Sequence, residues 1–475
     1  MNTKISEKQR TLIFINIIIS CIATTMMSTA LTTALPAIVH DLSISVNTGQ
    51  WLTSGYSLAM GIMMPLTAFL ITRFPTKKLY ISAIILFILG LGICSIAPNF
   101  LTMMIGRILQ ASGNGILSSM AQVILLTIYP MEKHGEVMGW YGLSIGAAPV
   151  IAPTIAGMLV DSSGWRMIFY ASISIMLLSL LFAIGVFSNV LEVRKQSFDV
   201  VSFVISAFAF GGITLGIGNI GAYSFTNSQV LFPLLLGALA ALLFVYRQLK
   251  LKQPFLDVRV AKNREFRISL ISSMLLYVVM MGSSILMPLY VQSIMGYSAT
   301  ISGLVTLPGS LAMTIVSPFA GRIYDRFGMK KLFITGAAFL LFSNVGMFLL
   351  TMSMPIWIAA LYNVMRCLAI GCLMMPLVTW GMSGIKQQKM AHGTALLTSL
   401  RTIAGAIGSA IFVSVMTVTA AHSQVTYGGN AQLHGLNIAF FGMSLCTFLL
   451  LIIAFFSVKK NTKKPEPLDT IVEIN

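Results

Sequence analysis

Long apolar runs separated by short polar stretches are the dominant pattern of this chain. Residues 11–39 contain no charged side chain over 29 positions, residues 200–246 contain none, and residues 268–321 contain none over 54 positions. A helix that crosses a bilayer needs roughly 20 apolar residues, so the longer runs must each hold two helices joined by a turn. We expect such turns where small and polar residues gather, near residues 222–228, 296–298 and 427–430.

This pattern predicts an all-α integral membrane protein with fourteen transmembrane helices. The composition agrees, because 57% of the residues are hydrophobic and only 9% are charged, which is too few charges for a water-exposed surface. The expected spans are residues 11–38, 51–71, 79–97, 101–128, 137–160, 166–187, 200–220, 229–248, 267–291, 300–321, 332–352, 355–380, 391–420 and 434–457.

Basic residues indicate the orientation of these spans. Of the 30 Lys and Arg residues, 26 fall in the N-terminal segment, in alternate loops and in the C-terminal tail, which share one side of the map. Short cytoplasmic loops carry such an excess, so we expect a multi-pass protein of the cell membrane with both termini in the cytoplasm. The net charge of +17 then reflects topology, and no nucleic-acid partner is expected. The five cysteines lie in apolar stretches without ligand spacing, so we expect no metal and no cofactor.

The chain contains a weak internal repeat. The loop at residues 321–331 shares an Arg-Phe pair and a Lys-Lys pair with residues 68–78, and Arg366 follows Arg107 at a similar offset. Repeated halves are common in transporters. We therefore expect two six-helix halves, helices 1–6 and 9–14, around an inserted pair, helices 7–8. The expected boundaries are 1–190, 191–260, 261–458 and, for a cytoplasmic tail, 459–475.

Several segments together resemble a known family. Residues 321–331 resemble the GxLxDRxGxxK signature, residues 107–115 resemble the RxxQGxG element, and residues 164–169 resemble the WRWIF block. On helix 5, Gly146, Pro149, Pro153 and Gly157 resemble a weakened antiporter element, and Thr29 fits an element of helix 1. The chain is similar to the major facilitator superfamily, specifically its fourteen-helix drug:proton antiporter branch, and within it to Gram-positive multidrug and lincosamide exporters.

The chain departs from that family at two places. Met27 stands where the branch usually has an acid on helix 1, and Thr72 stands where the first loop should have its Asp. Ala68 and Pro75 also replace both glycines of that loop. The first loop, which contains Arg73, is therefore expected to be weaker as a switch than the loop at residues 321–331.

Three arginines lie within predicted spans. Each charge inside a membrane costs an estimated 2.5–3.5 kcal/mol, or more if isolated. Arg107, with Gln110 and Asn114 on the same helix, is expected to take part in coupling or in recognition of substrate charge. The structural alternative is that Arg107 pairs with backbone carbonyls and locks helices together. For Arg366 a functional and a structural role remain equally open. Arg401 is expected one or two turns from the cytoplasmic end, where it pairs with backbone carbonyls or snorkels.

Proton coupling needs a group that titrates, which arginine does not. All thirteen carboxylates fall in loops or near helix ends on this map. Three candidates for the proton remain: Asp41, Asp161 and His392. Structural interpretations compete, because Asp161 can form a salt bridge with Arg166, which we favour, and His392 can be a solvated interfacial residue. The hydroxyls of helix 1, which include Thr25 and Thr29, either line the pathway or bond helices together.

The loop at residues 321–331 is the predicted conformational switch. A Gly-containing turn presents an acid among several cations, which can form charge pairs in one state and lose them in the other. On helix 5, glycines are expected to permit close packing and prolines to permit bending. The switch residues are Gly321, Asp325, Arg326, Gly328, Lys330 and, from the first loop, Arg73.

The first functional hypothesis is a secondary active exporter of amphiphilic drugs or antibiotics, which exchanges them for protons by alternating access. The alternative is an exporter of anionic amphiphiles such as fatty acids, or an importer. An enzyme is not expected, because no large loop exists to hold a catalytic cluster. The expected partners are an amphiphilic small molecule, protons and the bilayer, and the expected oligomeric state is a monomer.

Overall fold

The computed structural model describes residues 6–44, 46–191, 193, 198–221, 226–297 and 299–458. The side chains of Thr29, Pro149 and Pro153 lie outside this description, as does the tail after residue 458. Within the described part the chain is helical and contains no strand. This confirms the all-α fold class.

Fourteen of the described helices are long. Thirteen of them are long and apolar enough to cross a membrane, and α5, with 30 residues, is the other. Their bounds are α1 Glu7–Asp41, α2 Val46–Arg73, α3 Thr76–Ser95, α4 Phe100–Ile128, α5 His134–Ser163, α6 Met167–Val186, α7 Val200–Gly218, α8 Ser228–Lys250, α9 Arg264–Leu289, α10 Ala299–Phe327, α11 Met329–Phe348, α12 Ile356–Ser383, α13 Met390–His422 and α15 Ala431–Phe456. Shorter helical pieces are η1 Met131–Lys133, η2 Asn219–Gly221, η3 Val258–Lys262, the π-helical η4 Tyr290–Ile294, η5 Gln387–Lys389, α14 Gln424–Tyr427 and η6 Gly428–Asn430.

Local sequence explains several of these boundaries. Asn99, Asn227 and Asn263 each accept a hydrogen bond from a backbone N–H in the first turn of the helix that follows. Gly328 has a φ of 75°, which a residue with a side chain rarely adopts, and it alone separates α10 from α11. Asp325 therefore lies in the last turn of α10 and not in a loop, which corrects the expected helix end at residue 321.

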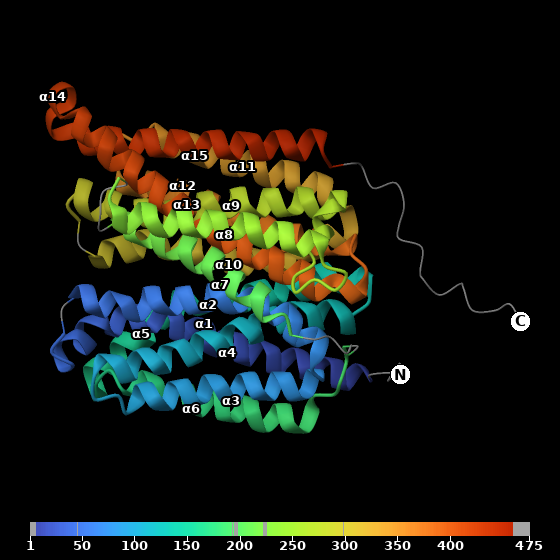
Figure 1. The fold of residues 1–475 in the computed structure, drawn as a ribbon. Coiled ribbons are helices and arrows are strands. Elements are labelled where there is room, and N and C mark those ends of the chain that lie inside the picture. Colours follow the sequence, from blue (N-terminus) through green and yellow to red (C-terminus); the bar gives the residue numbers. More distant parts are fainter. Residues whose placement is uncertain are drawn as a thin grey trace, which may run out of the picture.

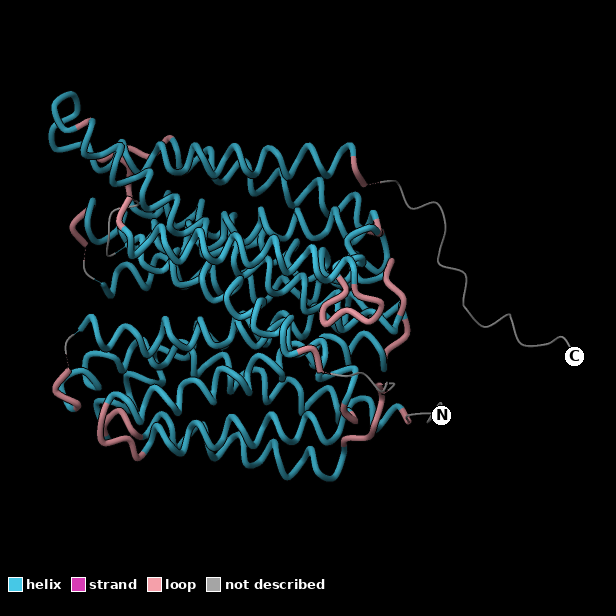
Figure 2. The backbone as a smooth tube through the Cα atoms, viewed as in Figure 1, coloured by secondary structure: helices cyan, strands magenta, loops and turns pink. Residues whose placement is uncertain are grey.

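The long helices form two bundles (Figures 1 and 2). In the N-terminal bundle α1 packs on α5 and α6, α3 on α4 and α6, and α2 on α4. In the C-terminal bundle α9 packs on α12 and α13, α11 on α12 and α15, and α10 on α12. The inserted helices α7 and α8 pack on each other, and α7 also contacts α2 and α13, so the insertion touches both bundles.

Helix α1 begins and α15 ends at the same end of the molecule (Figure 1). We call this the basic end, because the turns there include Arg73–Lys78, Lys133, Arg326–Lys331 and Lys386–Lys389. The other end is called the opposite end.

The two bundles meet mainly through α5 with α10 and α2 with α13. Near the basic end the contact is close: a Cβ built on Gly139 of α5 would lie 2.7 Å from the carbonyl oxygen of Ser317. Farther along α5, a Cβ on Gly146 would still lie 2.9 Å from Thr314 Oγ1. Near the opposite end, a Cβ on Gly157 of α5 or Gly303 of α10 would meet nothing within 4 Å. The expected close packing is therefore present at Gly146 and wrong for Gly157, because the two helices are tightly apposed only toward the basic end.

Candidate functional site

Arg107 lies inside the N-terminal bundle, where only 1% of its surface is exposed. Its Nε donates to the carbonyl oxygen of Leu52 at 3.0 Å, and its Nη1 donates to Gln110 Oε1 at 2.7 Å. Its guanidinium also stacks on the ring of Tyr56 at 4.1 Å. The structure thus gives Arg107 neutral partners on α2 and α4, a pattern that locks two helices together. The expected role of Arg107 in coupling stays a prediction.

Gln110 and Asn114 extend this polar group along α4. Gln110 Nε2 donates to Cys94 Sγ of α3 at 3.3 Å, and Asn114 Nδ2 donates to the hydroxyl of Tyr56 at 2.7 Å. Both side chains are buried. The three polar residues predicted on helix 4 are therefore brought together, but inside one bundle.

Arg366 is the counterpart of Arg107 in the C-terminal bundle and has fewer hydrogen-bond partners. It is 3% exposed, and it donates from Nη2 to Asn363 Oδ1, one turn earlier on α12. Its Nε and Nη1 are buried without a hydrogen-bond partner among the described residues. Among the described residues, rings stack on the guanidinium groups of Arg107, Arg166, Arg326 and Arg401, and none stacks on that of Arg366.

Arg401 lies deeper than expected. It is 11 residues after Met390, the start of α13, which is about 16 Å along the helix axis. Because only 6% of its surface is exposed, the expected snorkelling is wrong. Its Nε and Nη1 also have no hydrogen-bond partner among the described residues.

The surroundings of Arg401 come from both bundles. Its guanidinium lies 4.9 Å from the ring centre of Tyr277 on α9, and its helix α13 contacts α2 and α4 of the N-terminal bundle. Gln122 of α4 lies beside the hydroxyl of Tyr141 on α5, and Gln122 Oε1 is buried without a partner in the described part. Ser273, one turn before Tyr277 on the same face of α9, has an unpartnered buried Oγ as well. We call Arg401, Tyr277, Tyr141, Gln122 and Ser273 the Arg401 cluster.

The sequence analysis missed four members of this cluster. The criterion that selected Gln110 and Asn114, a polar side chain inside a span, would also have selected Gln122. No sequence signal distinguishes Tyr141 and Tyr277 from the other tyrosines. Their proximity to Arg401 depends on how α5 and α9 pack.

The predicted switch residue Asp325 joins the two bundles at the basic end. Its carboxylate accepts hydrogen bonds from the backbone N–H groups of Gly135, at 2.9 Å, and Glu136, at 2.8 Å, in the first turn of α5. The N-cap residue of α5 is Lys133, whose side chain makes no cap hydrogen bond. A residue of α10 thus supplies the negative group that the N-terminus of α5 favours.

Other members of the predicted switch surround Asp325. Gly321 contacts the backbone of Gly135 so closely that neither position has room for a Cβ. Arg322 forms an ion pair with Glu136 at 2.7 Å, with both side chains partly exposed. Arg326 stacks on Phe327, while Lys330 is the second residue of α11, after Gly328 and Met329. Of the predicted switch residues, Gly321 and Asp325 meet the first turn of α5, whereas Arg73 lies at the end of α2 in the other contact. Their role as a switch stays a prediction.

The equivalent contact between α2 and α13 is built differently. Thr72 donates its hydroxyl hydrogen back to the carbonyl oxygen of Phe69 in its own helix, and Arg73 is the last residue of α2. The acid here is Asp257, in the segment between α8 and α9, which accepts from Lys389 Nζ at 2.8 Å. The backbone N–H of Asp257 donates to His392 Nδ1 at 3.3 Å. His392 is buried, so the expectation of a solvated interfacial histidine is wrong.

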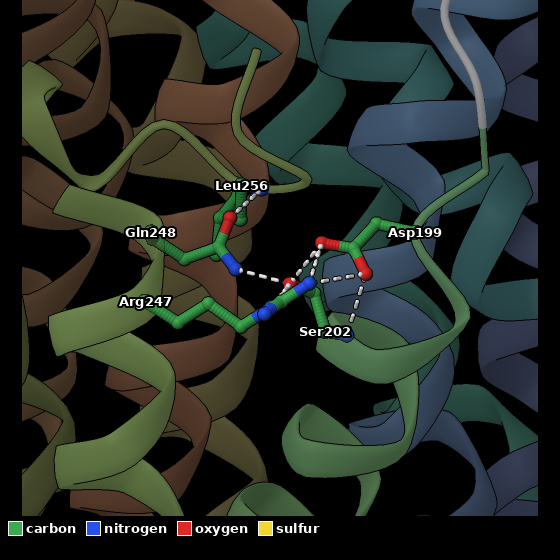
Figure 3. A network of polar contacts seen from close by, with 5 residues as sticks. All are labelled: Asp199, Ser202, Arg247, Gln248 and Leu256. Atoms are coloured by element: carbon green, nitrogen blue, oxygen red, sulfur yellow. Dashed lines mark hydrogen bonds and ion pairs between the residues drawn. The ribbon is translucent and has the colours of Figure 1, made fainter. Parts of the chain in front are cut away.

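A polar network holds the segment that contains Asp257 (Figure 3). Arg247 Nη2 donates to the carboxylate of Asp199, and Gln248 Nε2 donates to Ser202 Oγ at 2.7 Å. Gln248 Oε1 then accepts from the backbone N–H of Leu256 at 3.1 Å. Leu256 is fully buried and immediately precedes Asp257. The network therefore connects the start of α7, the end of α8 and the acid beside α13.

Two of these carboxyl groups have lowered pKa values. Burial acts to raise the pKa of Asp199, but hydrogen bonds from Ser202 and Arg247 more than offset it. Burial likewise opposes ionisation of Asp257, and the hydrogen bond and charge of Lys389 lower its pKa overall. Both groups are ionised at neutral pH.

At the opposite end, Arg166 has a different partner from the one we favoured. Its Nη1 donates to Asp41 Oδ2 at 2.7 Å, and Trp165 Nε1 donates to the same oxygen at 3.1 Å. These two donors lower the pKa of Asp41. Asp161 is exposed, and its expected pairing with Arg166 is wrong, because the turn after α5 directs Arg166 toward the end of α1.

Polar residues of α1 mainly bond helices together. Asn16 Nδ2 donates to the carbonyl oxygen of Ser179 on α6, and Ser20 bonds the hydroxyls of Tyr80 and Ser179. Thr25 is half-buried, and Met27 faces Ser172 of α6. A mostly apolar cavity of about 120 Å³ lies beside Met27 among α1, α5 and α6. The described residues contain no group of His, Cys, Asp or Glu that could hold a metal ion.

Two helical bundles with an inserted pair, buried cations and bridging contacts at one end define a polytopic membrane transporter. Residues 17–409 match the Major Facilitator Superfamily, and the chain belongs to that family. It is 37% identical over 98% of both chains to the uncharacterized MFS-type transporter YcnB of Bacillus subtilis. It is 35% identical to the lincomycin resistance protein LmrB of the same organism, over 82% of this chain and 81% of that one. These relatives confirm the predicted drug-exporter branch.

Two further similarities are less close. The chain is 26% identical to the riboflavin transporter RibZ of Clostridioides difficile, over 96% of this chain and 99% of that one. The structure of the proton:xylose symporter XylE superposes with a TM-score of 0.60 at 14% identity, covering 94% of this chain and 96% of that one. The superposition on XylE supports the two-bundle fold.

Proposed function

We propose that the chain is a secondary active exporter of amphiphilic small molecules, including antibiotics, which it exchanges for protons by alternating access. The similarity to lincomycin resistance proteins over more than four fifths of the chain carries this proposal. The structure supports it physically, since the bundles are tightly apposed at the basic end and separate along α5 and α10 toward the opposite end.

The orientation follows from the charges. Because short cytoplasmic loops are enriched in Lys and Arg, the basic end faces the cytoplasm, and the described arrangement is closed on that side. A solute would then reach the centre from the opposite end in this state and from the cytoplasm after the bundles rock. The protein functions as a monomer in the cell membrane.

The three candidates for the proton-carrying group differ in their contacts. Arg166 and Trp165 lower the pKa of Asp41 by hydrogen bonding to its carboxylate, which argues against Asp41 as the proton carrier. Asp161, which is exposed, and His392, which is buried beside Asp257, therefore remain as candidates among the three. Coupling through either group requires that its charge change between the two states.

The test is a growth-inhibition panel in a host that lacks its own efflux pumps. The compounds are lincomycin, a quaternary ammonium, a fluoroquinolone, decanoate and riboflavin, each with and without a protonophore. We expect protection against at least one amphiphile, and loss of that protection with the protonophore. Protection that persists after the proton gradient collapses would contradict proton coupling.

The control is Asp325→Asn, expressed to the same membrane abundance, which should give no protection. Absence of protection against every compound would contradict drug export. Uptake of the compound into right-side-out vesicles then distinguishes an importer from an exporter. An importer accumulates the compound inside the vesicles, whereas an exporter lowers its concentration there.

A further inference from the structure

The Arg401 cluster contains a buried cation that no acid neutralises among the residues that the structure describes. The described ion pairs involve Arg166, Arg247, Arg322 and Lys389, and none of them involves Arg401. The described carboxylates lie in loops or in the first or last turn of a helix, whereas Arg401 is three turns inside α13. A buried charge without a counter-ion is destabilising by several kcal/mol, so the site has a strong unused attraction for an anion.

The described neighbours of Arg401 include no acid and no acceptor for its Nε and Nη1. The ring of Tyr277 covers one face of the guanidinium, but Nε and Nη1 find no acceptor in the described part. Gln122 Oε1 and Ser273 Oγ are unpartnered too. A water molecule could satisfy some of these atoms, but it would leave the positive charge in place.

Position distinguishes Arg401 from the other two buried arginines. Arg107 is bonded to Leu52 and Gln110 within the N-terminal bundle, and Arg366 is bonded to Asn363 within its own helix. Arg401 belongs to α13, a helix of the C-terminal bundle that contacts α2 and α4 of the N-terminal bundle, so it lies on a helix at the boundary between the bundles. A solute that passes between the bundles would meet this arginine when they separate.

We propose that Arg401 is the specificity-determining residue for an anionic group on the transported molecule, namely a carboxylate carried by an otherwise apolar skeleton. This inference rests on the proposed transport function and names its substrate class. Tyr277 lies against the guanidinium of Arg401, and Arg401 Nε and Nη1, which have no partner among the described residues, would donate to the carboxylate. A permanent cation of the same size is disfavoured, because it would meet Arg401 with a like charge.

The test compares two probes that have the same alkyl chain and opposite charge, decanoate and decyltrimethylammonium. Binding is measured by isothermal titration to the full chain in lipid nanodiscs, for the wild type and Arg401→Gln. Removal of a charged hydrogen-bonding partner should weaken decanoate binding at least about tenfold. Binding of decyltrimethylammonium should stay the same or become tighter.

Arg366→Gln is the matched control, because it also removes a buried arginine with two unpartnered nitrogens. It should leave the preference between the two probes unchanged. Equal weakening of both probes by R401Q, or the same selective loss in R366Q, would overturn the assignment. If R401Q does not fold, Arg401→Lys is measured instead, and loss of the decanoate preference despite its retained charge would count against a charge-recognition role.

The binding assay tests the anion site, and the transport assay tests the exporter function, so each can be contradicted separately. A wild type that prefers decanoate in nanodiscs but exports nothing from cells would contradict the exporter function and leave the anion site standing. A wild type that exports amphiphiles but binds the two probes equally would contradict the anion site alone.

Discussion

The two contacts between the bundles at the basic end provide an acid near a helix N-terminus in different ways. Helices α5 and α13 both begin after a short 3₁₀ turn, with Lys133 or Lys389 as an N-cap residue whose side chain makes no cap hydrogen bond. At α5, the acid comes from the facing helix α10: Asp325 binds the first backbone N–H groups directly. At α13, the facing helix α2 has Thr72 at the equivalent position, and its hydroxyl is bonded within α2.

The missing acid at α13 has a substitute. Asp257, from the segment that follows the inserted helices, pairs with Lys389 and contacts His392. That segment is anchored by Phe255, which is 1% exposed and stacks on Phe69 of α2. The insertion thus links both bundles where the repeat has lost its acid. The difference indicates that the α5/α10 contact depends on one carboxylate, while the α2/α13 contact is shared with the linker.

The largest effect is expected for Asp325→Asn. The amide cannot accept two charge-assisted hydrogen bonds from the N-terminus of α5, and such bonds contribute about 1.5–3 kcal/mol. Transport should fall at least about tenfold, while membrane abundance on an immunoblot stays near normal. Unchanged transport would remove Asp325 from the switch.

A smaller effect is expected for Asp257→Asn, because the network of Figure 3 and the aromatic contact still hold the linker. Loss of a partly exposed ion pair amounts to roughly 0.5–1 kcal/mol, so transport should fall about threefold. If Asp257 replaces the acid that the first loop lacks at position 72, then adding Thr72→Asp to D257N should recover part of this loss. An effect as large as that of D325N would contradict the difference between the two contacts.

The pH dependence of Asp257 has a definite sign. Since its folded-state pKa is lowered, its contribution is present above the unfolded value of about 3.9 and is lost only as the pH falls through the lower folded value. The ratio of wild-type to D257N transport should therefore be constant from about pH 5 to about pH 8. A ratio that changes across neutral pH would place the titrating group elsewhere in this contact.

The smallest effect is expected for Arg322→Gln. The ion pair with Glu136 is half exposed to solvent, and exposed pairs contribute about 0.2–1 kcal/mol, less at high salt. Transport should fall by less than about threefold and should approach the wild-type level as the salt concentration rises. A loss equal to that of D325N would show that the pair, and not the helix N-terminus, holds the α5/α10 contact.

The sequence by itself determined the number of long helices, their approximate bounds and the family. Charge-free runs longer than one span require helical hairpins, because a bilayer admits backbone only with its hydrogen bonds made internally. It also marked Asp325 and Arg107, since an acid among cations at a turn and a charge inside a span are visible without coordinates. These signals are local and depend on residue type and spacing alone.

Only the tertiary structure decided which polar residues meet. It paired Arg166 with Asp41 in place of Asp161, buried His392 beside Asp257, and left Arg401 Nε and Nη1 buried without a hydrogen-bond partner in the described part. Each of these contacts joins helices far apart in the sequence, so it depends on the rotation and separation of packed helices. Hydrophobic spacing leaves those two quantities open, because in lipid an apolar face has no single preferred partner.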